Sequence, residues 1–248
     1  MQIPYFSLLN NCPIKISNIG SFKSPQLKEL FDNQKGFINY GFASSIFGTT
    51  KNEMIEKFKK IQIEIPKEVS ELSKFEILIS DDFLRQLFQN ALSYFLVENI
   101  QFESNMQVFG VYIGEDFIPE NIIGYIGKDN FDIVENIIQQ LMGQKIEDDK
   151  PEKFASELAR QAWEMRKEYE KDLKKNSAEG FDLGTMISKL CVAGIGYTFF
   201  NIYDLTVYQL YDAFSSYANM RIANLCDNAY AHNGGENHDV MLWAKSNN

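Results

Sequence analysis

The sequence predicts an α+β protein, with a small mixed or antiparallel sheet and helices over residues 1–145 and an all-helical part over residues 146–248. Three observations lead to this prediction. Apolar and polar residues alternate in short N-terminal segments, as they do in strands. Apolar residues recur every three or four positions in several longer segments, as they do in helices. The charged stretch QKIEDDKPEKF marks a domain boundary near residues 144–153.

The chain is expected to begin with a hairpin and a short helix. Isoleucines alternate with polar residues in IKISNIG at 14–20, and Asn18 and Gly20 suit the turn. Ser24 then resembles the N-cap of a helix, with Pro25 at its first position. The hairpin should pair locally, and the helix should place its leucines inward.

Two further helices and a strand are expected next. The glycine-rich and aromatic stretch 36–48 predicts a short buried helix. Thr50 and Glu53 form a capping box that begins another helix. The segment Phe75–Ile79, apolar except for Glu76, predicts a short buried strand, and Ser80 is the expected N-cap of the helix that follows it.

The rest of the N-terminal part alternates helix and strand. Apolar residues at helical spacing over 84–95 predict a helix, and the stretch 107–113 predicts a strand that pairs with IIGYIG at 122–127. A helix should start at Asp129 and stop at Gly143, because glycine readily adopts the left-handed conformation of a helix end.

The C-terminal part predicts three helices with apolar faces, and the middle one, over residues 181–194, has Leu183, Met186, Ile187, Leu190 and Cys191 inward. The helix that Pro151 opens carries a narrow stripe suited to a partner helix, although packing within the chain explains it too. The stripe consists of Phe154, Leu158, Ala162, Met165, Tyr169 and Leu173. Asn201 and Asp204 are expected to begin the last helix. Its inner face consists of Leu205, Tyr208, Tyr211, Phe214, Tyr217 and Met220.

The stretch LCVAGIGYTFF, residues 190–200, resembles a phosphate-binding loop only superficially. A dinucleotide loop follows a strand and reads GxGxxG, but Phe199 occupies the position of the third glycine and the preceding segment predicts a helix. We therefore expect Gly194 to end a helix and Gly196 to relieve the following turn. No cofactor is expected.

Net charge argues against some classes of partner, and the cysteines indicate the redox compartment. The net charge is −10 and the isoelectric point is about 4.8, so nucleic acid and anionic membrane surfaces should be repelled. The three cysteines are widely spaced, which favours a reducing cytosol over a disulfide framework. The N-terminal residues do not resemble a signal peptide.

Catalytic and metal-binding signatures are sparse. The two histidines, His232 and His238, match no zinc-site spacing. Cys226 with His232 is the only nucleophile–base pair that the sequence suggests, and it is a remote alternative. We therefore expect a protein that is not an enzyme.

Both ends of the chain resemble a family of phage proteins. The segments PIKISNIGSFKSPQLKELF and MISKLCVAGIGYTFFNIYDLTVYQLYDAFSSY are similar to tail assembly chaperone-like proteins of long-tailed phages and prophages of Gram-positive bacteria. The phrase T-x-x-Q-x-Y-D, here Thr206, Gln209, Tyr211 and Asp212, is part of this resemblance. It implies no catalytic residues.

The resemblance implies a non-enzymatic tail assembly factor in the host cytoplasm. Its client would be the helical tape-measure protein or another phage tail protein, with self-association of the chain as a further expectation. The expected contact residues are Phe154, Leu158, Met165, Tyr169, Leu173, Tyr208, Tyr211 and Tyr217. The alternative is a structural virion component of the tail, connector or baseplate.

Overall fold

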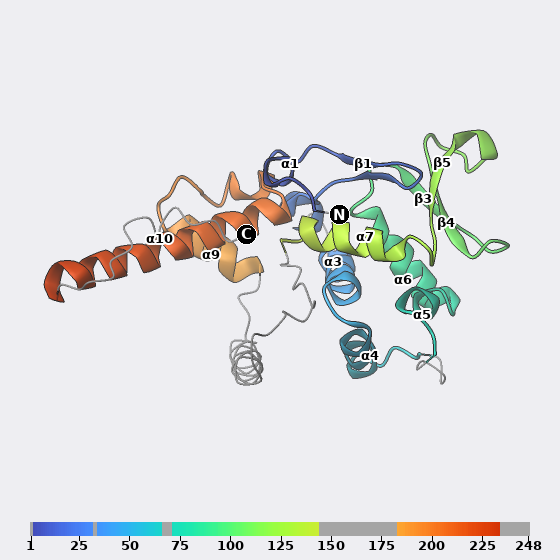
Figure 1. Cartoon of the computed structure of the whole chain (residues 1–248), viewed down its shortest axis with the longest axis horizontal. Coiled ribbons are helices and arrows are strands. Elements are labelled where there is room, and N and C mark those ends of the chain that lie inside the picture. Colours follow the sequence, from blue (N-terminus) through green and yellow to red (C-terminus); the bar gives the residue numbers. More distant parts are fainter. Residues whose placement is uncertain (1, 32–33, 66–70, 144–182, 234–248) are drawn as a thin grey trace, which may run out of the picture. The chain divides into compact units, whose positions relative to one another are not determined.

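The structure is a computed structural model that describes residues 2–31, 34–65, 71–143 and 183–233. Its contacts divide the chain into two compact units. One unit combines Met1–Ile146 with Phe200–Asn248, and the other is Glu147–Phe199. The predicted domain boundary at 144–153 lies outside the described residues. The described residues form helices and small antiparallel sheets, which confirms the α+β class (Figure 1).

The first unit contains most of the described elements. Its helices are α1 (Tyr5–Leu9), α2 (Leu27–Phe31), α3 (Gln34–Phe47), α4 (Lys51–Lys60), α5 (Lys74–Leu78), α6 (Asp82–Ser93), α7 (Phe131–Leu141) and α10 (Val207–Asn233), with short 3-10 turns at Pro119–Asn121 and Ile202–Asp204. Its strands are β1 (Ile14–Ile16), β2 (Gly20–Phe22), β3 (Asn99–Glu103), β4 (Val108–Tyr112) and β5 (Ile122–Ile126).

The two sheets are antiparallel throughout. Strands β1 and β2 form the predicted hairpin, with Asn18 in its turn at a φ of 60°, a conformation that asparagine tolerates. The second sheet has the order β3-β4-β5, so β4 pairs with β5 as the sequence predicted. Strand β3 was not predicted, because NIQFE holds a single pair of alternating apolar residues.

The core of the first unit is built on phenylalanine. Phe88 of α6 packs edge-on against Phe75, Phe109 and Phe131, with ring centroids 5.9, 5.1 and 5.7 Å away. Phe47 of α3 joins the cluster from another side. These rings come from four helices and one strand. A single aromatic cluster therefore holds one face of the β3-β4-β5 sheet against the helices.

The segment Phe75–Ile79 was wrongly predicted as a strand. It forms helix α5, which begins with a capping box: Glu76 N–H donates to Ser73 Oγ (3.2 Å), and Ser73 N–H donates to Glu76 Oε2 (2.7 Å). A short segment of mainly apolar residues does not distinguish strand from helix, so the caps decide. The next helix, α6, is likewise capped by Asp81 rather than by Ser80.

Two other predicted helix starts are also corrected. Ser24 does not cap α2; Glu29 instead accepts from Gln26 N–H at 3.0 Å. Asn201 makes no side-chain cap and precedes only a 3-10 turn, and α10 begins at Val207. In both places the predicted residue is of a type that caps helices, but another residue makes the cap: Glu29 at α2 and Thr206 at α10. The capping box of Thr50 and Glu53 is confirmed.

The described part of the second unit contains helix α9 (Leu183–Val192). Gly194 follows it at a φ of +71° and Gly196 lies at +98°, so both glycines adopt the left-handed conformations expected of a helix end and a turn. A helix, not a strand, therefore precedes GIGY. This arrangement is a joint after a helix and differs from a dinucleotide-binding loop.

Candidate interaction surface

The long helix α10 starts from a fully formed capping box. Gln209 N–H donates to Thr206 Oγ1 at 3.1 Å, and Thr206 N–H donates to Gln209 Oε1 at 2.8 Å. These two residues are the first half of the T-x-x-Q-x-Y-D phrase. Because Thr206 is buried, the cap satisfies backbone donors in a place that water does not reach.

The start of α10 pairs with the segment before α2. Val207 N–H donates to the Pro25 carbonyl (2.9 Å), and Leu27 N–H donates to the Leu205 carbonyl (2.8 Å). Between them, Ser24 is 1% exposed and its hydroxyl makes two bonds. It accepts from Tyr208 N–H at 3.2 Å and donates to the Leu141 carbonyl at 2.9 Å. Ser24 thus joins α10 to the end of α7.

Helix α1 also contacts the start of α10. We call the residues that hold this helix start the α10 socket: Tyr5, Leu9, Ser24, Thr206, Tyr208, Gln209 and Asp212. Gln209 Nε2 donates to the Leu9 carbonyl at 2.7 Å, and the Tyr5 hydroxyl donates to Asp212 at 3.1 Å. Burial, reinforced by the Asp212 charge, raises the pKa of Tyr208 to about 12. The tyrosine hydroxyls here therefore stay protonated at physiological pH and can donate hydrogen bonds.

The predicted contact tyrosines lie at different depths along α10. Tyr208 is 8% exposed and belongs to the socket. Tyr211 is partly buried, and a Cβ added at Gly143 would lie 2.9 Å from its Cβ. Tyr217 is also partly exposed, further along the helix. The other predicted contact residues lie outside the described residues: Phe154, Leu158, Met165, Tyr169 and Leu173.

Beyond its base, α10 presents large apolar side chains. The helix has 27 residues, which corresponds to a length of about 40 Å. Met220 and Leu225 are 40% and 64% exposed, while Ala223 between them is buried. Figure 1 shows α10 as one unbroken helix. Beyond its base, the described part of α10 therefore combines exposed apolar side chains with a buried alanine, and we call this part of the helix the α10 arm.

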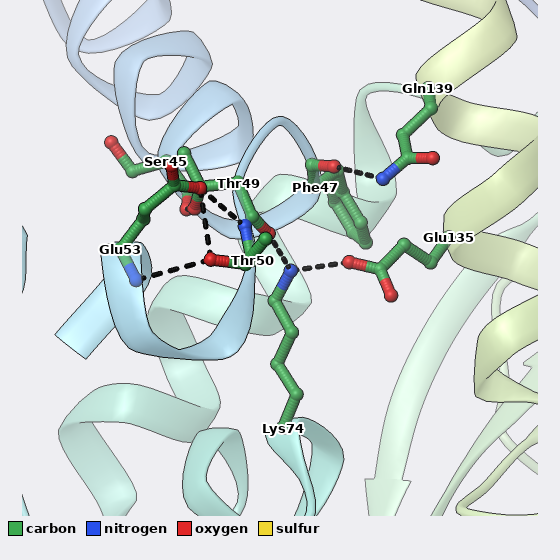
Figure 2. Close-up of polar contacts among 8 residues, drawn as sticks. All are labelled: Ser45, Phe47, Thr49, Thr50, Glu53, Lys74, Glu135 and Gln139. Carbon is green, nitrogen blue, oxygen red and sulfur yellow. Dashed lines mark hydrogen bonds and ion pairs between the residues drawn. The ribbon is translucent and has the colours of Figure 1, made fainter. Parts of the chain in front are cut away.

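A second polar cluster lies between α3, α5 and α7 (Figure 2). Lys74 Nζ donates to the Thr49 carbonyl at 2.7 Å and to the Glu135 carboxylate, and Gln139 Nε2 donates to the Phe47 carbonyl at 2.8 Å. Burial lowers the pKa of Lys74 and raises that of Glu135, while their mutual attraction opposes both shifts. These hydrogen bonds connect α5 and α7 to the C-terminal end of α3.

The remote Cys–His alternative is not tested, because the side chains of Cys226 and His232 lie outside the described part of the structure. The described residues of the chain contain no group of three or more His, Cys, Asp or Glu side chains that could hold a metal ion.

The sequence contains a local signal for the start of α10. T-x-x-Q, here Thr206 and Gln209, has the pattern of a capping box and predicts a helix that begins at Val207. No local pattern reveals the role of Ser24, because its partners Leu141 and Tyr208 are distant in sequence.

Comparison with known proteins gives one match. Residues 174–248 match the family described as the YomV second domain, and this match indicates a phage-associated protein. The matched segment is less than a third of the chain and contains the whole of α10. No match was found among curated proteins or among solved structures. Among the described helices, none has the length and apolar character needed to span a membrane.

Proposed function

We propose that this chain is a non-enzymatic phage tail assembly factor that binds a helical protein partner along α10. The observation that carries the proposal is the arm itself, which is held by Thr206, Gln209 and Ser24 at its base and exposes Met220 and Leu225 further along. The family match supports it, because the matched residues include this whole helix.

The geometry favours a helical client over a small ligand. Helices bind one another through side chains spaced three and four residues apart. Met220 and Leu225 are five residues apart and lie on different sides of α10, so the proposed contact with a client involves more than one side of this helix. The stripe from Phe154 to Leu173 is the second predicted contact of the same kind. The tape-measure protein, with its long helices, is the proposed client.

Co-expression with the tape-measure protein of the same gene cluster tests the proposal. We expect the two proteins to co-purify, and we expect the variant Met220→Ser/Leu225→Ser to weaken the complex by about tenfold or more, because two buried apolar contacts are lost. The matched control is Ile38→Ser/Ile61→Ser, which removes two apolar side chains of similar exposure from α3 and from the end of α4.

Three outcomes would count against this proposal. Recovery of both proteins separately, each folded, would exclude a stable complex with the tape-measure protein. Detection of the chain at a fixed copy number in purified particles by mass spectrometry would instead favour a structural virion component, because an assembly factor leaves the particle. If both double variants weakened the complex equally, α10 would not be the part of the chain that contacts the tape-measure protein.

A further inference from the structure

The outer face of the β3-β4-β5 sheet carries a fixed aromatic pair. Phe109 and Val111 of β4 are buried, so Gly110 between them faces the opposite side of the sheet. A Cβ at Gly110 would lie 2.5 Å from Phe117 Cε2, which means that Phe117 rests directly on the glycine. Phe117 also packs edge-on against Tyr112, with ring centroids 5.2 Å apart.

Strand pairing extends this apolar face to β5. Gly110 pairs with Tyr125, and Tyr112 pairs with Ile122, so both β5 residues lie on the same side of the sheet as Phe117. Both are solvent-exposed. We call Tyr112, Phe117, Ile122 and Tyr125 the β4-β5 face.

The loop that places Phe117 is ordered by its own hydrogen bonds. Ile113 N–H donates to the Asn121 carbonyl at 3.1 Å, and Asn121 Nδ2 donates to the Asp116 carbonyl at 2.9 Å. The aromatic pair of Tyr112 and Phe117 is therefore already held in place in the free protein, and a partner does not have to order it on binding.

The chain segment that carries this face has charges of a single sign. Residues 86–127 contain no lysine, arginine or histidine, and they contain five acids. Three of these, Glu115, Asp116 and Glu120, are exposed on the loop that holds Phe117. The next cation along the chain, Lys128, donates to Glu76 at 2.7 Å. The β4-β5 face is thus apolar at its centre, and the loop beside it carries three exposed acids.

We propose that the β4-β5 face binds a protein segment in which apolar residues are interspersed with lysine or arginine. Like-charge repulsion disfavours a second copy of this face, nucleic acid and anionic lipid, whereas a basic and apolar segment complements both the aromatic pair and the acidic loop beside it. This surface is separate from α10 and does not depend on the function proposed for that helix.

The test uses a short fluorescein-labelled peptide that alternates lysine with valine, titrated with the full chain and followed by fluorescence anisotropy. We expect saturable binding whose Kd rises about tenfold or more between about 50 and about 500 mM NaCl. Hydrogen exchange should slow on binding within residues 108–126. The variant Glu115→Gln/Asp116→Asn/Glu120→Gln should raise the Kd about fivefold or more at low salt.

A matched variant separates this site from net charge. Glu56→Gln/Glu64→Gln/Glu71→Gln removes the same charge from exposed acids on and after α4, and it should change the Kd less than about twofold. Ile122→Thr should weaken binding at both salt concentrations, whereas Ile61→Thr should not. Met220→Ser/Leu225→Ser should leave peptide binding intact, which keeps this test independent of the client test.

Three results would overturn the proposal: no saturable binding at low salt, equal weakening by the two triple variants, or slowed hydrogen exchange outside residues 108–126. The second result would reduce the interaction to a non-specific attraction between an acidic protein and a cationic peptide.

Discussion

Replacing Ser24 with alanine should destabilise the protein far more than the loss of one hydroxyl suggests. The Ser24 hydroxyl is buried and lies between two backbone groups, the Leu141 carbonyl at 2.9 Å and the Tyr208 N–H at 3.2 Å. Alanine would leave both groups buried without this partner. A buried polar group without a partner costs about 1–3 kcal/mol, so we expect a loss of about 2–4 kcal/mol in the free energy of unfolding.

Urea denaturation followed by circular dichroism measures this loss. The matched control is Ser45→Ala, because the Ser45 hydroxyl only donates to the Gly41 carbonyl of its own helix, at 2.9 Å. That change should alter the stability by less than about 0.5 kcal/mol. If Ser24→Ala is no more destabilising than Ser45→Ala, the joint between α7 and α10 does not depend on this hydroxyl and the reasoning fails.

Three further predictions concern other parts of the first unit. Lys74→Met should cost about 3–5 kcal/mol by leaving the Glu135 charge buried, and adding Glu135→Leu should recover part of that loss in the same urea assay. Gly124→Ala should lower the melting temperature, since its Cβ would lie 2.6 Å from backbone of the β1-β2 turn, whereas Gly41→Ala, with open space around it on α3, should raise it. Hydrogen bonds, of which the one from Lys128 is the strongest cause, lower the pKa of Glu76 from 4.5 to about 2. The ionised Glu76 should therefore stabilise the fold above pH 4.5, and this stabilisation should disappear as the pH falls towards 2. Glu76→Gln should flatten that pH dependence of stability.

The predicted contacts at Tyr208, Tyr211 and Tyr217 stay predictions. The structure adds that Tyr208 is buried at the base of α10. Spacing identifies the apolar side of a helix but not which turns its own chain covers. The β4-β5 face was not anticipated at all, because it depends on strand register and on Phe117 returning over Gly110.

Sequence alone determined the elements whose signals are local. The hairpin turn at Asn18, the capping box of Thr50 and Glu53, and the glycine ends at Gly143 and Gly194 depend on a few neighbouring residues, so they could be predicted from those residues. The acidic, aromatic-rich character of the chain is likewise a property of composition.

Tertiary structure decided whatever depends on residues far apart in the chain. Phe75 of α5 is buried because its ring partners Phe88, Phe109 and Phe131 come from other parts of the chain, whereas the capping box of Ser73 and Glu76 was a local signal that was missed. Ser24 serves as a joint because α7 and α10 meet there, more than a hundred residues later. A buried polar or apolar group is stable only beside a complementary partner, and the fold, not the neighbouring sequence, supplies that partner.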